Sequence, residues 1–225
     1  MNIEPIAYIH TDFDEKFGIP RQSGRVRSLT GRIVFVPEYR NPEALRGIDG
    51  FSHLWLLFDF SLAHREGWSP TVRPPRLGGN TRVGVFASRS PFRPNNIGLS
   101  CVRFERIEKT PDEGDALIVS GVDLLDMTPI YDIKPYIPYA DCHEDAVGGY
   151  ADRESGHRLD VVFPDEMLEL IPDEKRQAAS DCLADDPRPA YQNDPARIYS
   201  MAFAGFDIRF TIDGDVLRVT EVVRR

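Results

Sequence analysis

Residues 51–60 read FSHLWLLFDF, a long apolar run that is typical of a buried β-strand. Shorter segments rich in β-branched and apolar residues precede and follow it, and Gly and Pro separate them at the spacing of an all-β sandwich or barrel. These segments are Ile3–His10, Arg32–Val36, Val83–Ala87, Leu99–Ile107 and Ala116–Val122. Strands do not alternate with helices, which argues against a doubly wound parallel sheet. The sequence therefore predicts a mainly β fold.

The composition becomes polar and glycine-containing over residues 140–156 (ADCHEDAVGGYADRESG), where we expect the linker between two domains. Beyond it, Asp173–Leu183 has the pattern of a short helix, and Asp213-Gly214 between two apolar stretches predicts a β-hairpin. We therefore expect an N-terminal β-barrel domain over residues 1–145 and a small α+β domain over residues 146–225.

The bulk composition is that of an ordinary soluble protein, with 225 residues, 41% of them hydrophobic and 28% charged. The N-terminus lacks a signal-peptide pattern, and no apolar run reaches the roughly 18–20 residues of a membrane span. The three cysteines form no CxxC pair, and the five histidines show no ligand spacing. We expect a cytoplasmic protein without a metal ion, a disulfide framework or a membrane partner.

A block of positive charge reverses the overall sign of the chain, whose formal net charge is −9. Between Arg65 and Arg106 there are eight arginines against only Glu66 and Glu105. Arg suits planar, bidentate contact with phosphate or carboxylate. The prolines and glycines of residues 71–100 (TVRPPRLGGNTRVGVFASRSPFRPNNIGLS) hold such groups on stiff loops that approach a ligand closely. This block predicts a binding site for an anionic ligand.

The common cofactor fingerprints are missing, including GxGxxG, the P-loop and GxSxG. Two other features each have two readings. His53 is either a core or edge residue of its strand, or a ring that meets a polar ligand at the barrel mouth. Residues 18–25 (GIPRQSGR) are either a surface loop or a rigid segment whose Arg and Gln recognise a carboxylate or an adenine edge.

Two further segments are equally open. Residues 123–139 (DLLDMTPIYDIKPYIPY) either form a loop around a barrel end or supply Asp126, Asp132 and Lys134 for chemistry. Residues 186–191 (DPRPAY) are either a staple between domains or a loop that places Arg and Tyr over a pocket, with the ring stacked on a base.

Six segments, taken together and in order, resemble the TrmO (TsaA/YaeB) family of tRNA methyltransferases over nearly the whole chain. They are FGIPRQSG (17–24), RGIDGFSHLWLLF (46–58), GWSPTVRPPRLGG (67–79), VGVFASRSPFRPNNIGLS (83–100), DLLDMTPIYDIKPYIPYA (123–140) and DPRPAY (186–191). The resemblance implies S-adenosylmethionine-dependent methylation of N6 on N6-threonylcarbamoyladenosine at position 37 of tRNA. It also implies a β-barrel, a small C-terminal domain, a homodimer, and the tRNA anticodon loop as a partner.

The resemblance also assigns residues to the methyl-donor pocket. Together with the ligand reading of His53, the cofactor-binding set is Pro20, Arg21, Gln22, His53, Ser61, Leu62, Arg89, Leu99, Asp126, Met127 and Thr128. The chain departs from the family pattern at Ser61, Asn96 and Met127, where His, Pro and Gly are usual. A glycine at position 127 permits a positive φ or a close approach of the ligand.

Methylation of N6 needs an acceptor for the N6 proton, because the nitrogen lone pair is delocalised in a urea-like group. Our catalytic candidates are Asp126 first and Asp132 second. The substrate-binding candidates are Arg73, Arg76, Arg93, Lys134, Arg188 and Tyr191. The alternatives are a non-catalytic module that binds S-adenosylmethionine, or a methyltransferase that acts on a different RNA base or a small molecule.

Overall fold

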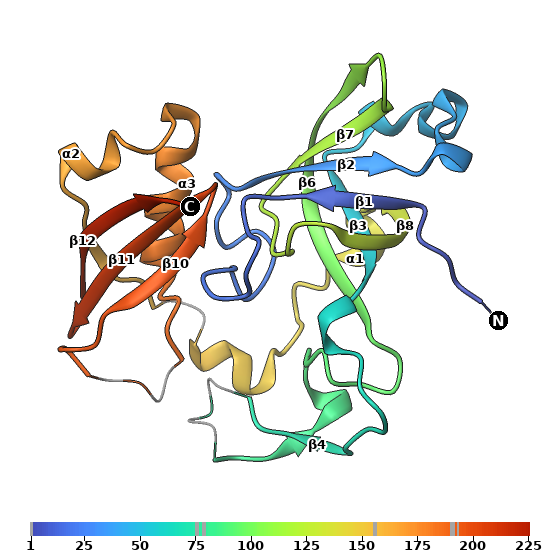
Figure 1. Ribbon diagram of the computed structural model, residues 1–225. Helices are drawn as coiled ribbons and strands as arrows, with labels where there is room; N and C mark the ends of the chain where they lie inside the picture. Colours follow the sequence, from blue (N-terminus) through green and yellow to red (C-terminus); the bar gives the residue numbers. More distant parts are fainter. Residues whose placement is uncertain (1, 75–76, 78–79, 155–156, 190–191, 193) are drawn as a thin grey trace.

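The computed structural model describes residues 2–74, 77, 80–154, 157–189, 192 and 194–225. It consists of two β-structures that lie side by side, with the segment 11–29 between them (Figure 1). The strands of the first are β1 (Ala7–His10), β2 (Thr30–Phe35), β3 (His53–Asp59), β6 (Ile97–Thr110), β7 (Gly114–Ser120) and β8 (Thr128–Pro135). The predicted mainly β fold is confirmed.

The six strands of the first structure form a closed barrel in the order β1-β2-β7-β6-β3-β8. Closure results from β8, which pairs antiparallel with β3 on one side and with β1 on the other. Along β3, Leu54, Leu56 and Phe58 are buried, while Trp55 and Leu57 are only partly so. The apolar run 51–60 therefore has one face in the barrel core and one face outside it.

The structure differs from two of the sequence interpretations of this domain. Val83–Ala87 is not one strand. The short β5 (Val83–Gly84) pairs with β4 (Thr71–Val72), and a 3-10 turn follows β5. Residues 128–135, for which a loop around a barrel end was one of two readings, form strand β8. The strand contains Pro129 and Pro135, which cannot donate to a ladder. Both prolines lie at the ends of β8's paired stretch, where the lost donors are tolerated.

The second structure is a four-stranded sheet with the order β10-β11-β12-β9. Its elements are β9 (Asp160–Val162), α2 (Asp165–Leu168), α3 (Asp173–Ala184), β10 (Tyr199–Phe203), β11 (Phe206–Asp213) and β12 (Val216–Arg224), preceded by α1 (Pro138–Asp141). Helix α3 and the hairpin at Asp213-Gly214 confirm the sequence expectations.

The loop 11–29, which joins β1 to β2, contacts both sheets. The ring of Phe13 meets Phe203 of β10 edge-on at 5.3 Å. Arg25 forms an ion pair of 2.6 Å with Asp185, whose side chain is only 5% exposed. The loop has no helix or strand of its own, so its conformation depends on these contacts. The predicted segment 18–25 is therefore held between the two structures and is not a free surface loop.

Residues 61–96 form an excursion between β3 and β6 that we call the arginine lobe. The lobe carries the small β4–β5 sheet and projects from one end of the barrel (Figure 1). It opens with a 3-10 turn at Ser61–Ala63 and returns where Phe60 N–H donates to the carbonyl of Asn96 at 2.8 Å. The lobe therefore begins and ends at one point of the barrel mouth.

Candidate functional site

A carboxylate near the barrel mouth, Asp123, organises the site. The hydroxyl of Ser100 on β6 donates to Asp123 Oδ1 at 2.6 Å, and the backbone N–H of Ser23 also donates to this carboxylate. The Ser23 hydroxyl in turn accepts a hydrogen bond of 3.2 Å from the N–H of Cys101. We call Ser23, Ser100 and Asp123 the Asp123 cluster. It attaches the loop 11–29 to the barrel.

A chain of hydrogen bonds joins three of the predicted donor-binding residues, and Arg89 in this chain acts on Asp123 through its charge. Arg89 of the arginine lobe donates to Gln22 Oε1, and Gln22 Nε2 donates to the carbonyl of Arg21. The guanidinium of Arg21 donates to the carbonyl of Arg188 at 2.5 Å. The structure thus brings Arg21, Gln22 and Arg89 together, and it joins the lobe, the loop and the C-terminal structure through them.

Burial raises the pKa of Asp123 to about 6, although the Ser100 hydroxyl, the two backbone N–H groups and the charge of Arg89 pull the pKa downward. Sequence reasoning missed this residue and chose Asp126 and Asp132 from the same segment. The available signal was position, because Asp123 is the first carboxylate after the apolar strand that ends near Val122.

The Asp126–Thr128 turn lies where β8 begins beside β1. Asp126 Oδ1 accepts a hydrogen bond of 3.0 Å from Thr11 N–H, and it lies 3.4 Å from His10 Nδ1. Met127 has a φ of 60°, and its side chain is exposed. The left-handed conformation is therefore used at the position where the family pattern has glycine. The turn presents one accessible carboxylate beside an imidazole.

Ser61 and Leu62 lie in the 3-10 turn that follows β3, and Lys16 Nζ donates to the carbonyl of Leu62 at 3.2 Å. The same loop 11–29 therefore contacts this turn as well as the Asp123 cluster. His53 begins β3, six residues before Asp59, which is roughly 20 Å along a strand. Its Nδ1 is 2.9 Å from the Ser52 hydroxyl. The structure does not bring His53 to the other candidates.

Two more candidates lie on the outside of the barrel. Leu99 pairs with Leu57, and its side chain is exposed. Asp132 pairs with Leu57 from the other side, and its Oδ2 is 2.7 Å from Lys134 Nζ. Asp132 and Lys134 therefore form an ion pair with each other.

The predicted tRNA-binding residues do not all lie in one part of the structure. Arg73 and Arg93 belong to the arginine lobe, whereas Arg76 and Tyr191 lie outside the described residues. Arg188 is only 11% exposed, and its Nε lies 3.1 Å from Asp186 Oδ1. Its guanidinium is therefore engaged inside the C-terminal structure. Of the two readings of residues 186–191, these contacts favour the staple between domains, because the carbonyl of Arg188 accepts the hydrogen bond from Arg21.

Two hollows on the surface of the described residues bear on the site. The larger, about 570 Å³, is lined by the C-terminal structure and contains none of the predicted residues. Its Arg225 is paired with Asp14 and Glu15, so this charge is already neutralised. The smaller, about 210 Å³, lies in the arginine lobe. Among the described residues, no helix is both long and apolar enough to cross a membrane, and no three His, Cys, Asp or Glu side chains are grouped to hold a metal ion.

The fold and the site define a two-part β protein in which a loop, a basic lobe and a buried carboxylate meet at one end of a barrel. Two family models match the chain in sequence order. The tRNA-methyltransferase O N-terminal domain covers residues 8–142, and the TrmO C-terminal domain covers residues 157–225. The chain belongs to the tRNA-methyltransferase O family.

Individual relatives agree with this assignment. The tRNA (adenine(37)-N6)-methyltransferase of Escherichia coli is 41% identical over 93% of this chain and 92% of its own length. A protein of the same name from Eikenella corrodens is 44% identical over 77% of this chain and 97% of its own. A crystal structure of TrmO from Pseudomonas aeruginosa is 35% identical, covers 99% of this chain and 98% of its own, and superimposes with a TM-score of 0.80.

Proposed function

We propose that this protein transfers the methyl group of S-adenosylmethionine to N6 of adenosine 37 in tRNA, with N6-threonylcarbamoyladenosine as the acceptor nucleoside. The observation that carries the proposal is the match to the Escherichia coli tRNA (adenine(37)-N6)-methyltransferase along almost the full length of both proteins. The basic lobe beside the Asp123 cluster supports it, because a protein of net charge −9 presents its local excess of arginine where an anionic tRNA can bind.

The residues at the barrel mouth suit the methyl donor. Arg89 and Gln22 offer a guanidinium and an amide to the donor's carboxylate, and the segment Pro20–Gln22 offers backbone groups beside them. Ser61 and Leu62 contribute the turn contacted by Lys16, and their backbone can serve although the family's usual histidine is missing. When bound, S-adenosylmethionine supplies an electrophilic methyl group and is released as a neutral thioether.

The protein's own chemical task is to orient the acceptor nitrogen and remove its proton. We assign the proton to Asp126, because its carboxylate lies on an exposed turn and is held by Thr11 N–H. Asp132 is the weaker candidate, since Lys134 already neutralises it. Asp123 has its oxygens occupied by Ser100 and Ser23, so we assign it a positioning role toward Arg89.

We further propose a cytoplasmic homodimer with two domains that divide near residue 145. The exposed side chains of Ile97 and Leu99 on β6, and of Leu62 in the turn after β3, support an association surface. The gap between the two family models, residues 143–156, supports the division.

Mass spectrometry of tRNA nucleosides from a deletion strain tests the proposed activity. The methyl group on N6-methyl-N6-threonylcarbamoyladenosine should disappear and return when the gene is restored, but not when the Asp126→Asn variant is supplied. An unchanged nucleoside profile would instead favour a donor-binding module. That alternative has a specific basis, because a 36% identical Pyrococcus abyssi relative, aligned over 72% of this chain, is described as a probable S-adenosyl-L-methionine-binding protein.

A further inference from the structure

The arginine lobe gathers arginines that carboxylates do not neutralise. Outside the lobe, arginines such as Arg25, Arg32 and Arg225 pair with carboxylates. Within the described residues of the lobe, no arginine forms an ion pair. Arg93 donates only to the carbonyls of Ser88 and Ser90. These charges are therefore available to an external anion.

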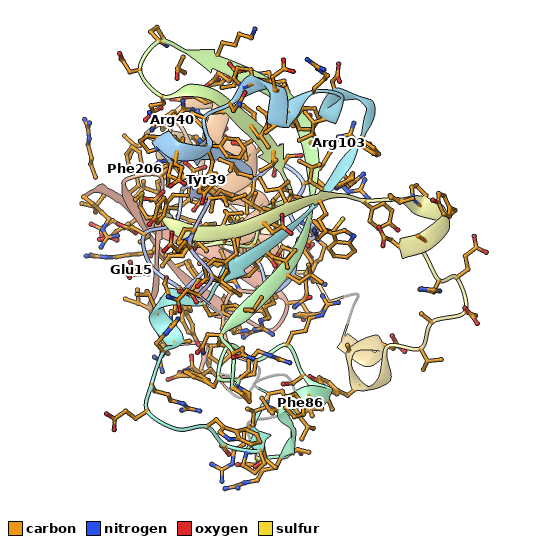
Figure 2. All side chains as sticks on the ribbon, turned by 90° about the vertical axis from the view of Figure 1, so that its right-hand side faces the viewer. Glu15, Tyr39, Arg40, Phe86, Arg103 and Phe206 are labelled. Atoms are coloured by element: carbon orange, nitrogen blue, oxygen red, sulfur yellow. The ribbon has the colours of Figure 1, made fainter. Side chains whose placement is uncertain are left out.

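The lobe also exposes aromatic rings. Trp68 is 52% exposed and Phe86 is 75% exposed, and their ring centroids are 6.2 Å apart with planes tilted by 33°. Phe92 is partly exposed, with the Arg65 guanidinium lying 4.3 Å above its ring. Figure 2 shows Phe86 in the lower part of the molecule, away from Tyr39 and Arg40 in the upper half. Large rings exposed beside unpaired cations indicate a ligand that is both flat and anionic.

The hollow of about 210 Å³ lies among these groups. Trp68 and Phe92 form apolar walls, and Arg65, Arg93 and Asn96 supply polar ones. Its volume is below the roughly 300–1,000 Å³ that is usual for sites of drug-sized ligands. It is therefore too small for the whole methyl donor but suitable for one planar ring.

We propose that this hollow and the adjoining Trp68–Phe86 pair bind one unpaired base of the tRNA anticodon loop, separate from the base that is methylated, while Arg65 and Arg93 contact the flanking phosphates. Stacking on aromatic side chains is how unpaired RNA bases are commonly held. This subsite rests on the proposed function and specifies how the protein binds its tRNA substrate. A second copy of the chain that met this lobe with its own lobe would oppose like charges, which disfavours that occupant.

Tryptophan fluorescence tests the subsite without any methyl transfer. The chain has two tryptophans, and Trp55 is partly buried with its indole N–H on Asp141 at 3.1 Å. In a Trp55→Phe variant, Trp68 is the only reporter. Titration with an unmodified anticodon stem-loop RNA should quench this emission through stacking. If the Trp55→Phe variant does not fold, the difference between wild type and Trp68→Phe isolates the same signal.

The affinity for the same RNA should fall about 5- to 150-fold in Trp68→Ala, which is the range for loss of one base–aromatic stack. Trp68→Phe should retain most of the affinity, because a smaller aromatic face remains. Tyr139→Ala is the matched control, since this ring is 92% exposed but lies outside the lobe, and its affinity should be unchanged. Calorimetry with S-adenosylmethionine should give the same affinity in all variants.

The outcomes separate the two proposals. Methyl transfer with an unchanged KM for tRNA in Trp68→Ala, together with unquenched Trp68, overturns the subsite and leaves the proposed function intact. Quenching and the expected loss of affinity without any methyl transfer support the subsite and overturn the proposed function. Sedimentation that shows a dimer in wild type but a monomer in Trp68→Ala assigns the rings to a protein interface, which overturns the subsite.

Discussion

Replacing Asp123 by Asn should make the folded protein more stable at neutral pH while weakening its hold on the methyl donor. The pKa of Asp123 is raised from 3.8 to about 6, mainly by burial, so the ionised carboxylate is less favourable in the folded chain than in the unfolded one. The stability that the neutral form provides is fully present below pH 3.8 and is lost as the pH rises through 6. At 1.36 kcal/mol per pKa unit, the loss between pH 4.5 and pH 7.5 is about 2 kcal/mol.

Urea unfolding of wild type and Asp123→Asn at these two pH values measures the effect. An asparagine keeps the size of the side chain and the acceptor for the Ser100 hydroxyl, but it cannot ionise. The free energy of unfolding of wild type should therefore fall by about 2 kcal/mol relative to the variant between pH 4.5 and pH 7.5. A difference that is constant with pH, or that changes in the opposite direction, would refute the reasoning.

Whereas Asp123→Asn should stabilise the fold at neutral pH, it should weaken the binding of S-adenosylmethionine. Ionised Asp123 is the countercharge near Arg89, so Asp123→Asn should raise the Kd for S-adenosylmethionine at pH 7.5. At pH 5 the two proteins should converge, because Asp123 is then largely neutral in wild type. Ser100→Ala removes a hydrogen bond that favours the charged form, so it should move the midpoint of this pH dependence upward. Calorimetry across this pH range measures both effects, and a wild-type affinity that does not change below pH 7 would contradict them.

Three further substitutions test other parts of the site. Arg89→Ala should raise the Kd for S-adenosylmethionine about 10- to 100-fold, the usual effect of a lost charged hydrogen bond, and an unchanged calorimetric affinity removes this residue from the pocket. Met127→Gly should increase stability by about 0.5–1 kcal/mol in urea unfolding, because it relieves a φ of 60°, whereas Met127→Ala should give no gain. Gly18→Ala should destabilise the protein by about 1–3 kcal/mol, since φ is +97° and a Cβ would lie 2.5 Å from the Met201 side chain; an unaltered thermal midpoint would show that the loop yields freely.

The sequence was informative where a local pattern decides the structure. The 12 residues of α3 and the turn at Asp213-Gly214 follow from propensity and turn chemistry, and six short segments were enough to identify the family. Strand β8 was not predicted as a strand; its prolines lie at the ends of a paired stretch, where they are compatible with a strand. The domain boundary, the donor-binding set and the proton acceptor stay predictions.

The relations between distant segments were not predictable in this way. The Asp123 cluster joins Ser23 to the backbone of Cys101 across 78 positions, and no local pattern signals that contact. The contacts of Arg188 were not predictable for a related reason. The sequence does not distinguish an arginine that binds phosphate from one that is paired with a carboxylate. For Arg188, the only local sign of pairing was Asp186, two residues before it.

The loop 11–29 connects the proposed donor site to the C-terminal structure. A loop of this length without helix or strand is uncommon in a compact domain unless it serves a function, and ordering each of its residues opposes folding by roughly 1–2 kcal/mol. The barrel holds it through the Asp123 cluster and through backbone contacts such as that between Gly24 and Gly121. Ion pairs hold it from the other side, where Asp12 meets Lys175 at 2.7 Å and Arg25 meets Asp185 at 2.6 Å. Because the Pro20–Gln22 segment lies within this loop, we expect the C-terminal structure to take part in shaping the proposed donor site.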